Sequence, residues 1–400
     1  MNFSQIVLVT LVASHFCADT SLAQSTYPQA LLNQKGTFSR QGAEAMGEEF
    51  QGLRTSDGLV QGLFPIRQTG ISTAPLAEAG NAFLAMLSDA QLSRTQFPID
   101  DPEWRNWSNV DVGIFARHGV SLEEMTEAQK EAAWNLLRVS LSARGLRTTQ
   151  DIMKTEQTLL ELNGEAIRYG EDKYYFTVMG IPSATEPWGW QLDGHHLVIN
   201  YFIQGGQVVM TPSFFGGEPV VTTSGLYEGN TILQDEQNFG LAFMTSLDSM
   251  QRQQATLSTA KTANAPMAAA NEDNMVLDYA GLAGDEMTSE QKAELLQLIG
   301  IHVGNMRDDH AKVRMEEVEA HLNETHFAWV GEVSEDAVFY YRIHSPVVLI
   351  EFDHQNPVGT TMINERSKPT RDHIHIVVRT PNGNDYGKDL LRQHLESHPH

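Results

Sequence analysis

Hydrophobic and polar residues follow two different periodicities along the chain. Apolar positions that recur every three to four residues predict amphipathic helices at 74–91, 121–141 and 149–162. Apolar and aromatic runs bounded by turn residues predict buried strands at 174–179, 197–203 and 372–379, and one strand or two, broken near Ser345-Pro346, at 339–352. The predicted fold class is therefore α+β (or α/β), with helices covering antiparallel or mixed sheets.

One helix pattern and the segments after it occur twice. Gly119-VSLEEMTEAQKEAAWNLL resembles Gly281-LAGDEMTSEQKAELLQLI at a constant offset. Each copy continues through a second helix, a Tyr-Tyr strand, a His-bearing apolar strand and a Thr-Pro dipeptide, at 211 and 380. This order predicts two related helix-helix-strand halves, about 107–250 and 275–394, with convergent helix caps and chance as the alternative.

The His-bearing strands of the two copies are Asp193-GHHLVIN and Asp372-HIHIVVR. In the alignment of the two copies His196 corresponds to His375, and His195 has no histidine counterpart. If the halves pack about a pseudo-twofold axis, we expect the His196 and His375 rings to approach each other.

Charge and composition narrow the classes of partner. The 400 residues include 51 acidic and 27 basic side chains, a net charge of −24, and 41% of them are hydrophobic. Such a surface repels nucleic acids and anionic membranes, so we expect neither as a partner. A small-molecule substrate is expected instead, and the oligomeric state is left open.

The first 23 residues have the pattern of a secretory signal peptide. A short apolar core, 6–13, precedes the small-x-small sequence Ser21-Leu22-Ala23. We therefore expect a secreted or periplasmic protein, divided into the signal peptide (1–23), an irregular or helical lead-in (24–106) and one domain (107–394). Cys17, the only cysteine, lies in the predicted signal, which excludes a cysteine nucleophile from the mature chain.

The stretch 188–201, WGWQLDGHHLVINY, places two histidines at the start of a predicted strand. Asp193-Gly194 predicts a tight turn before that strand. Because successive strand side chains point to opposite faces, His195 and His196 are predicted to face opposite sides of the sheet.

The strand near the C-terminus carries the strongest chemical signal. His373 and His375, at i and i+2, project from one face, which is a common chelating arrangement for first-row metals. Glu351 or Asp353 on the preceding strand is a candidate for a carboxylate ligand, and Glu351 also for a general base. The alternative is that these histidines are packed and bonded to backbone or carboxylate groups.

A divalent metal ion is the predicted cofactor, zinc first, with iron or copper as alternatives. His196 would be the third nitrogen ligand, with His195 as the alternative. Arg379, on the same strand face as His373 and His375, is a candidate for binding a substrate anion.

Asp385 and His394 are candidates for groups that orient the ligands, although Asp385 also fits a helix cap. The chain contains no G-x-S-x-G, no HExxH and no Gly-rich phosphate loop after a strand, so those catalytic and nucleotide-binding classes have no support. The predicted function is a metal-dependent hydrolase, with an iron or copper oxidoreductase and a non-catalytic exported binding protein as alternatives.

Several segments resemble the family catalogued as domain of unknown function 3500. They are 187–202 (PWGWQLDGHHLVINYF), 211–219 (TPSFFGGEP), 327–331 (FAWVG), 340–353 (YYRIHSPVVLIEFD) and 373–394 (HIHIVVRTPNGNDYGKDLLRQH). The loop 354–372 is not matched to the family pattern. The resemblance implies one compact unit and supplies no reaction.

Overall fold

The computed structural model of the chain describes residues 29–397. The predicted signal peptide and Cys17 lie outside this range. Among the described residues, no helix is both long and apolar enough to cross a membrane.

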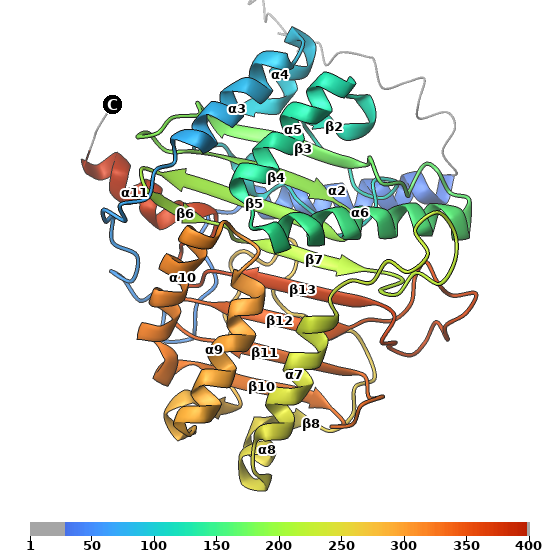
Figure 1. Cartoon of the computed structure of the whole chain (residues 1–400), viewed down its shortest axis with the longest axis vertical. Coiled ribbons are helices and arrows are strands. Elements are labelled where there is room, and N and C mark those ends of the chain that lie inside the picture. Colours follow the sequence, from blue (N-terminus) through green and yellow to red (C-terminus); the bar gives the residue numbers. More distant parts are fainter. Residues whose placement is uncertain (1–28, 398–400) are drawn as a thin grey trace, which may run out of the picture.

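Thirteen strands within 29–397 form a single mixed sheet, which extends through the whole molecule (Figure 1). In chain order they are β1 Gln96–Phe97, β2 Val120–Ser121, β3 Tyr174–Gly180, β4 Trp188–Gly194, β5 Leu197–Gln204, β6 Gln207–Val209, β7 Ser213–Gly217, β8 Thr256–Ser258, β9 Leu282–Ala283, β10 His326–Gly331, β11 Phe339–His344, β12 Leu349–His354 and β13 Ile374–Arg379.

The helices of the same range complete the α+β fold that the sequence predicts. They are α2 Gln29–Gly47, α3 Ala74–Met86, α4 Asp89–Thr95, α5 Glu127–Ser140, α6 Ala143–Asn163, α7 Gln234–Ser246, α8 Ser249–Ala255, α9 Ser289–Val303, α10 Asp308–Ala320 and α11 Lys388–Ser397. The Thr-x-x-Gln pattern of Thr126 and Gln129, typical of a capping box, does form one and begins α5.

The strands of the first half of the chain and those of the second half take matching positions when the sheet is read inwards from its two edges. The strand order runs β1-β3-β4-β5-β7-β13-β12-β11-β10-β8, and the antiparallel pair β7–β13 lies at its centre. At each edge a short strand runs parallel to its neighbour, β1 beside β3 and β8 beside β10. Each series of long strands follows two helices that pack on the same sheet face, α5 and α6 before β3, and α9 and α10 before β10.

Two glycines occupy matching places in the two series. Gly119 and Gly281 both have positive φ, 85° and 94°. A Cβ on either would lie 2.0 Å from the Phe176 carbonyl oxygen or 2.1 Å from that of Phe327, so neither position accepts a larger residue. These contacts relate β3, which contains Phe176, to β10, which contains Phe327.

The sheet order differs from the sequence alignment of the His-bearing segments. It makes β5 the positional counterpart of β12, and β7 that of β13. His196 precedes β5, whereas His375 lies in β13, so the two histidines do not occupy equivalent strands. Short apolar strands resemble one another in sequence, and periodicity alone does not distinguish the third strand of a series from the fourth.

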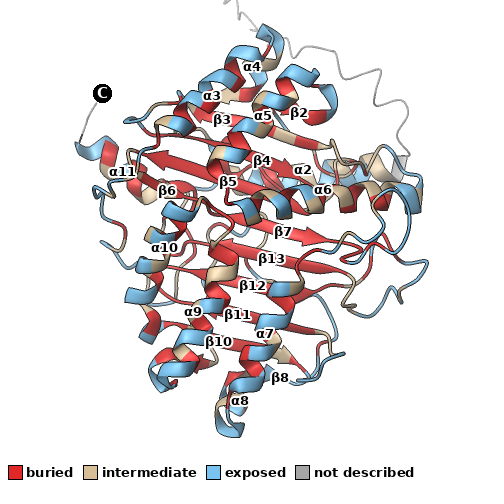
Figure 2. Ribbon diagram, in the orientation of Figure 1, coloured by how far each residue is buried: buried red, intermediate tan, exposed pale blue. Residues whose placement is uncertain are grey.

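The two faces of the sheet are covered differently. Helices α3, α5, α6, α7, α9 and α10 lie over one face, where most of the apolar core is found (Figure 1). The other face is covered by α2, α11 and irregular segments that bring in Trp104 and Trp107. The central strands are therefore buried on both faces (Figure 2), which explains their nearly continuous apolar sequences.

Candidate metal centre

The two adjacent histidines form the turn between β4 and β5. Asp193 and Gly194 are the last residues of β4, so the turn lies two residues later than predicted. His196 has φ 61°, in the left-handed region that histidine enters more readily than most non-glycine residues.

This turn changes where the two rings point. The rule of alternating strand faces does not apply inside a turn, and the prediction of opposite faces is wrong. Instead, the imidazoles of His195 and His196 stack, with centroids 3.7 Å apart and planes at 27°.

Three histidines from the two series of strands meet at one end of the β7–β13 pair. The Nε2 atoms of His196 and His373 are 3.3 Å apart, and those of His373 and His375 are 2.9 Å apart. All three residues are buried. The expected approach of His196 to His375 is confirmed, with ring centroids 5.4 Å apart.

The other ring nitrogens of two of these histidines have hydrogen-bond acceptors. His196 Nδ1 lies 2.8 Å from the Glu156 carboxylate, and His373 Nδ1 lies 2.8 Å from the carbonyl oxygen of Asn356. A neutral imidazole that donates from Nδ1 has only a lone pair on Nε2. The Nε2 lone pairs of His196 and His373 therefore face each other at the centre of the cluster.

Glu156 is the carboxylate of this site, and the sequence reasoning missed it. It projects from the buried face of α6, near Ile152 and Leu159, and its two oxygens accept from His195 Nδ1 at 2.9 Å and His196 Nδ1 at 2.8 Å. Burial by itself raises the pKa of Glu156, but the charge of His195 and the hydrogen bonds from both histidines lower it to about 2. A glutamate within the apolar stripe of a helix was the available signal.

His195 is near the cluster but does not join the three converging nitrogens. Its Nδ1 is bonded to Glu156, and its ring lies between those of His196 and Tyr169. Its side chain is 16% exposed, whereas that of His196 is 1% exposed. His195 therefore forms the outer side of the site.

Backbone groups and small residues fix the positions of the rings. The Gly216 amide, on β7, donates to the His196 carbonyl at 2.7 Å. A Cβ on Gly216 would lie 3.1 Å from Cδ2 of His375, so glycine leaves room for that ring. The edge of the His375 ring meets Phe214, with centroids 4.9 Å apart.

A second buried carboxylate, that of Glu218, lies beside the Nδ1 atom of His373. Glu218 Oε2 lies 3.6 Å from His373 Nδ1, and its oxygens accept from three backbone amides, 358–360, and from the Thr360 hydroxyl. Burial raises the pKa of Glu218, but the charge of His373 and the hydrogen bonds from Thr360 and Gly359 keep the pKa below its usual value. The loop 354–372 thus carries part of the support for the cluster.

The family model described as protein of unknown function (DUF3500) matches residues 69–388. The chain belongs to the DUF3500 family. The match begins well upstream of 187–202, the first segment on which the sequence resemblance rests, and includes α3, α4 and all the histidines of the cluster. No curated protein and no solved structure shows a significant match to the chain.

Glu351 is not brought to the histidines in this DUF3500 chain. It pairs with Val377 across β12 and β13, two residues along the strands from the pair formed by Asp353 and His375. Its oxygens accept from the backbone amides 267 and 268 and from the Tyr340 hydroxyl. The carboxylate that was predicted as a metal ligand or general base therefore already accepts hydrogen bonds from the segment that follows α8.

Arg379 shares a strand face with His375 but lies four residues along, about 13 Å away. It is fully buried, pairs with Asp273 at 2.8 Å and Asp385 at 2.9 Å, and donates to the carbonyl oxygens of residues 268 and 269. The structure thus places Arg379 inside a buried ion-pair network, where its donors have protein partners.

Asp385 and His394 also lie apart from the histidine cluster. Asp385 accepts from the Thr380 amide at 2.7 Å and from Arg379, so it braces the arginine and orients no metal-site imidazole. His394 is on α11, with Nε2 3.5 Å from the Glu186 carboxylate. These contacts do not support the hypothesis that either side chain orients a ligand imidazole.

Proposed function

We propose that the protein is a metal-dependent hydrolase whose metal ion is held by His196, His373 and His375. The observation that carries the proposal is the convergence of three buried Nε2 atoms, two of which have their Nδ1 protons bonded to acceptors. Lone pairs that face one another repel, and a cation between them turns that repulsion into three favourable bonds.

The spacing of these atoms fits such an ion. Three nitrogens bound tetrahedrally at 2.0–2.1 Å are about 3.3 Å apart. The distance from His196 Nε2 to His373 Nε2 is 3.3 Å, and that from His373 Nε2 to His375 Nε2 is 2.9 Å. Only a small ring movement separates the second distance from the tetrahedral value.

The ligand set favours zinc. Three imidazoles with an open position are typical of hydrolytic zinc centres, whereas non-haem iron oxygenases usually have two histidines and a carboxylate. A zinc ion here would act as a Lewis acid and lower the pKa of a bound water. Glu156 and the Asn356 carbonyl would hold the ligand rings, the supporting arrangement usual at zinc sites.

The exposure of the site supports a small-molecule substrate. His195 is the most exposed of the four imidazoles, while His196, His373 and His375 are each no more than 9% exposed. A ligand would therefore approach past His195. We further propose an exported location, secreted or periplasmic, for which the signal-like segment 1–23 is the support.

We also infer that the two series of strands arose by duplication. The support is the near-palindromic strand order and the matched glycines Gly119 and Gly281. The ligands would then come from non-equivalent strands of the two copies, so the site would have been acquired after the copies diverged.

Metal analysis of the purified protein tests the ligand assignment. We expect about one zinc per chain in the wild type and loss of the metal in His196→Asn. Asparagine suits this test because it removes the imidazole yet tolerates positive φ, whereas alanine would add backbone strain. His326→Asn is the matched control, because His326 is a partly exposed histidine on β10, three strands from β13.

Equal metal content in the wild type and His196→Asn would contradict the assignment. The reaction class is tested separately with p-nitrophenyl acetate and a panel of amides and phosphate esters, comparing zinc-loaded and chelator-treated protein. If the zinc-loaded protein hydrolyses none of them faster than His196→Asn, the hydrolase assignment fails while the metal site stands.

A copper oxidoreductase is the second candidate, because an all-imidazole ligand set also suits copper. The optical spectrum separates the two candidates, since zinc is colourless and Cu²⁺ absorbs visible light. The absence of a carboxylate from the converging group disfavours the iron alternative.

A further inference from the structure

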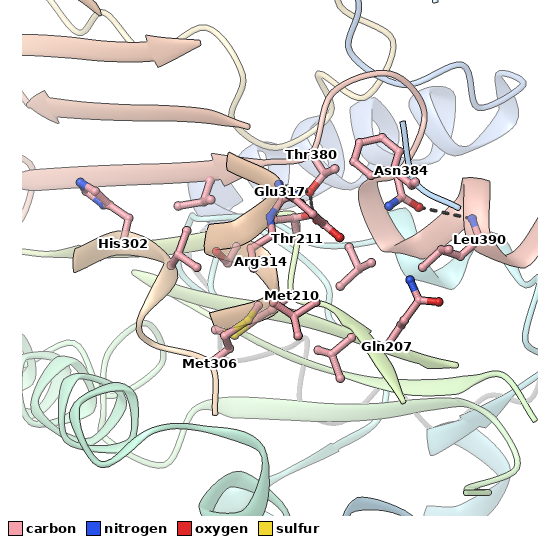
Figure 3. Close-up of a pocket in the computed structure, with 17 residues that line it drawn as sticks. Gln207, Met210, Thr211, His302, Met306, Arg314, Glu317, Thr380, Asn384 and Leu390 are labelled. Carbon is pink, nitrogen blue, oxygen red and sulfur yellow. Dashed lines mark hydrogen bonds and ion pairs between the residues drawn. The ribbon is translucent and has the colours of Figure 1, made fainter. Parts of the chain in front are cut away.

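A cavity of about 40 Å³ lies at the opposite end of the β7–β13 pair from the histidines (Figure 3). Its walls are the ends of these strands, the segment 207–211, and helices α9 and α10. A space of this size holds on the order of two or three water molecules. None of the groups assigned to the metal centre lines it.

The Thr-Pro dipeptides that recur in the sequence meet in this wall. Thr211 precedes β7 and Thr380 follows β13, and their hydroxyl oxygens are 2.7 Å apart. Ser213, two residues after Thr211, also lines the cavity. Figure 3 shows Thr211 and Thr380 next to Arg314, whose Nη2 donates to the Thr380 hydroxyl oxygen at 3.1 Å.

Several donors in this wall have no protein acceptor within the range that the structure describes. Thr211, Ser213 and Thr380 have three hydroxyl protons, of which the Thr211–Thr380 bond uses one. Arg314 donates to Glu317 from Nη1 and to the Val347 carbonyl from Nη2, but its Nε–H has no acceptor among residues 29–397. The other two hydroxyl protons likewise have no acceptor in the described part of the chain.

Charge and polarity indicate what would supply the missing acceptors. Arg314 and Arg67 share the single carboxylate of Glu317, so this group of three has a net charge of +1. Gln207, His302 and Asn384 add polar groups to the lining, and the apolar part of the wall includes Met210, Val303, Met306, Val313 and Leu390. An anionic group with several acceptor oxygens and a short apolar tail complements both parts of the cavity.

We propose that this cavity binds a short-chain carboxylic acid. The carboxylate accepts from the hydroxyls of Thr211 and Ser213 and from Arg314, and the tail lies between Met210 and Met306. Since carboxylate–arginine hydrogen bonds are charge-assisted, the head group provides most of the specificity. The site is independent of the metal centre and of the proposed hydrolase activity.

The segment 61–73 provides a route into the cavity. It has no regular secondary structure, and its Phe64 is part of the cavity wall. Gln207 holds it through the Arg67 amide at 2.7 Å and the Pro65 carbonyl at 3.2 Å. Opening the stretch 64–67 also breaks the bond from Gln393 to the Phe64 carbonyl at 2.8 Å, the bond from Arg67 to the Val313 carbonyl at 3.4 Å and the ion pair between Arg67 and Glu317, but no bond between strands of the sheet.

Titration of the full-length protein with sodium propionate, followed by methyl NMR of the methionines, tests the proposal. We expect saturable shifts of Met210 and Met306 with a millimolar Kd, and affinity at least fivefold weaker in Ser213→Ala. Ser224→Ala, which removes an exposed serine hydroxyl outside the cavity, is the matched control and should bind like the wild type.

Three comparison ligands separate the alternatives. Propionamide or 1-propanol binding as well as propionate would overturn the carboxylate assignment in favour of a merely apolar cavity. Inorganic phosphate binding as well as propionate would overturn the requirement for a tail. Absence of saturation at 100 mM propionate, or unchanged affinity in Ser213→Ala, would mean that the wall donors bind only water.

Discussion

Replacement of Glu156 provides a direct test of how the histidine cluster is held. Both oxygens of this buried carboxylate accept imidazole protons, from His195 at 2.9 Å and from His196 at 2.8 Å. In Glu156→Ala both Nδ1–H groups lose their acceptor, and each buried unpaired donor costs about 1–3 kcal/mol. The His196 ring is then free to rotate away from His373.

Glu156→Gln should have a smaller effect for a specific reason. The amide has one acceptor and one donor, so it can satisfy one imidazole as before and must face the other with an N–H. His195 can accept that N–H by changing tautomer, because its Nε2 is not among the converging nitrogens. His196 cannot do so without placing a proton on the Nε2 that would bind the metal.

The order of zinc affinity follows from this difference. Loss of a carboxylate behind a ligand histidine typically weakens metal binding about 10–100-fold, or about 1.4–2.7 kcal/mol. We expect Glu156→Ala near the upper end of this range and Glu156→Gln near the lower end. Competition with a chromophoric zinc chelator measures both, and circular dichroism checks that the metal-free proteins are folded.

Two results would refute the reasoning. Unchanged zinc affinity in folded Glu156→Ala would show that the carboxylate does not hold His196 for metal binding. Weaker binding in Glu156→Gln than in Glu156→Ala would show that the tautomer argument is wrong. Glu351→Gln is a useful comparison, because it alters a buried carboxylate that lies outside the cluster and should leave zinc affinity unchanged.

Three further predictions concern one residue beside the histidine cluster and two buried residues away from it. Gly216→Val should displace the start of β13 together with the His375 ring, since a Cβ there would lie 2.9 Å from the Ile374 carbonyl oxygen and 3.1 Å from that ring. Zinc affinity should fall about tenfold in the chelator assay, and wild-type affinity would contradict the packing argument. Arg379→Met should leave two buried aspartates without their shared cation and reduce the free energy of unfolding, measured in urea, by about 3–5 kcal/mol. The zinc affinity of the folded protein should be unchanged. A change in zinc affinity without a loss of stability would show that Arg379 takes part in the metal site. Burial lowers the pKa of His302 to about 3, so the stability that the neutral side chain contributes is present above pH 6.5 and is lost as the pH falls towards 3. By pH 4.5 the loss in the free energy of unfolding is at most about 3 kcal/mol. His302→Phe should remove this part of the pH dependence measured by urea unfolding.

Local patterns were sufficient for several helices and for the strands β3, β5, β11, β12 and β13. Thr126 and Gln129 form the capping box that the sequence predicts, and α5 begins directly after Thr126. The strand containing His375 was likewise predicted, beginning at 372 instead of 374, because an apolar run between turn residues has few alternatives. Such signals depend only on neighbours in sequence.

The details of the metal site depended on information that no local pattern contains. The Asp-Gly dipeptide predicted the turn two residues too early, because the left-handed conformation lies at His196 instead of a glycine. Glu351 and Arg379 were placed on the correct strand, but a distant segment carrying Ala268 and Asp273 covers them. The path of that irregular segment across the sheet is a tertiary property.

The position of the cluster has a consequence for the stability of the whole chain. His196 comes from the first series of strands, and His373 and His375 come from the second, so an ion at the site would join the two sides of the β7–β13 pair. Metal that binds only the folded state stabilises it by about 2.7 kcal/mol when its free concentration is 100 times Kd. Because both series contribute ligands, neither can unfold alone without losing the ion. Added zinc should therefore raise the unfolding midpoint of both series together, and a series that unfolds separately at an unchanged midpoint would show that the ion does not bridge them.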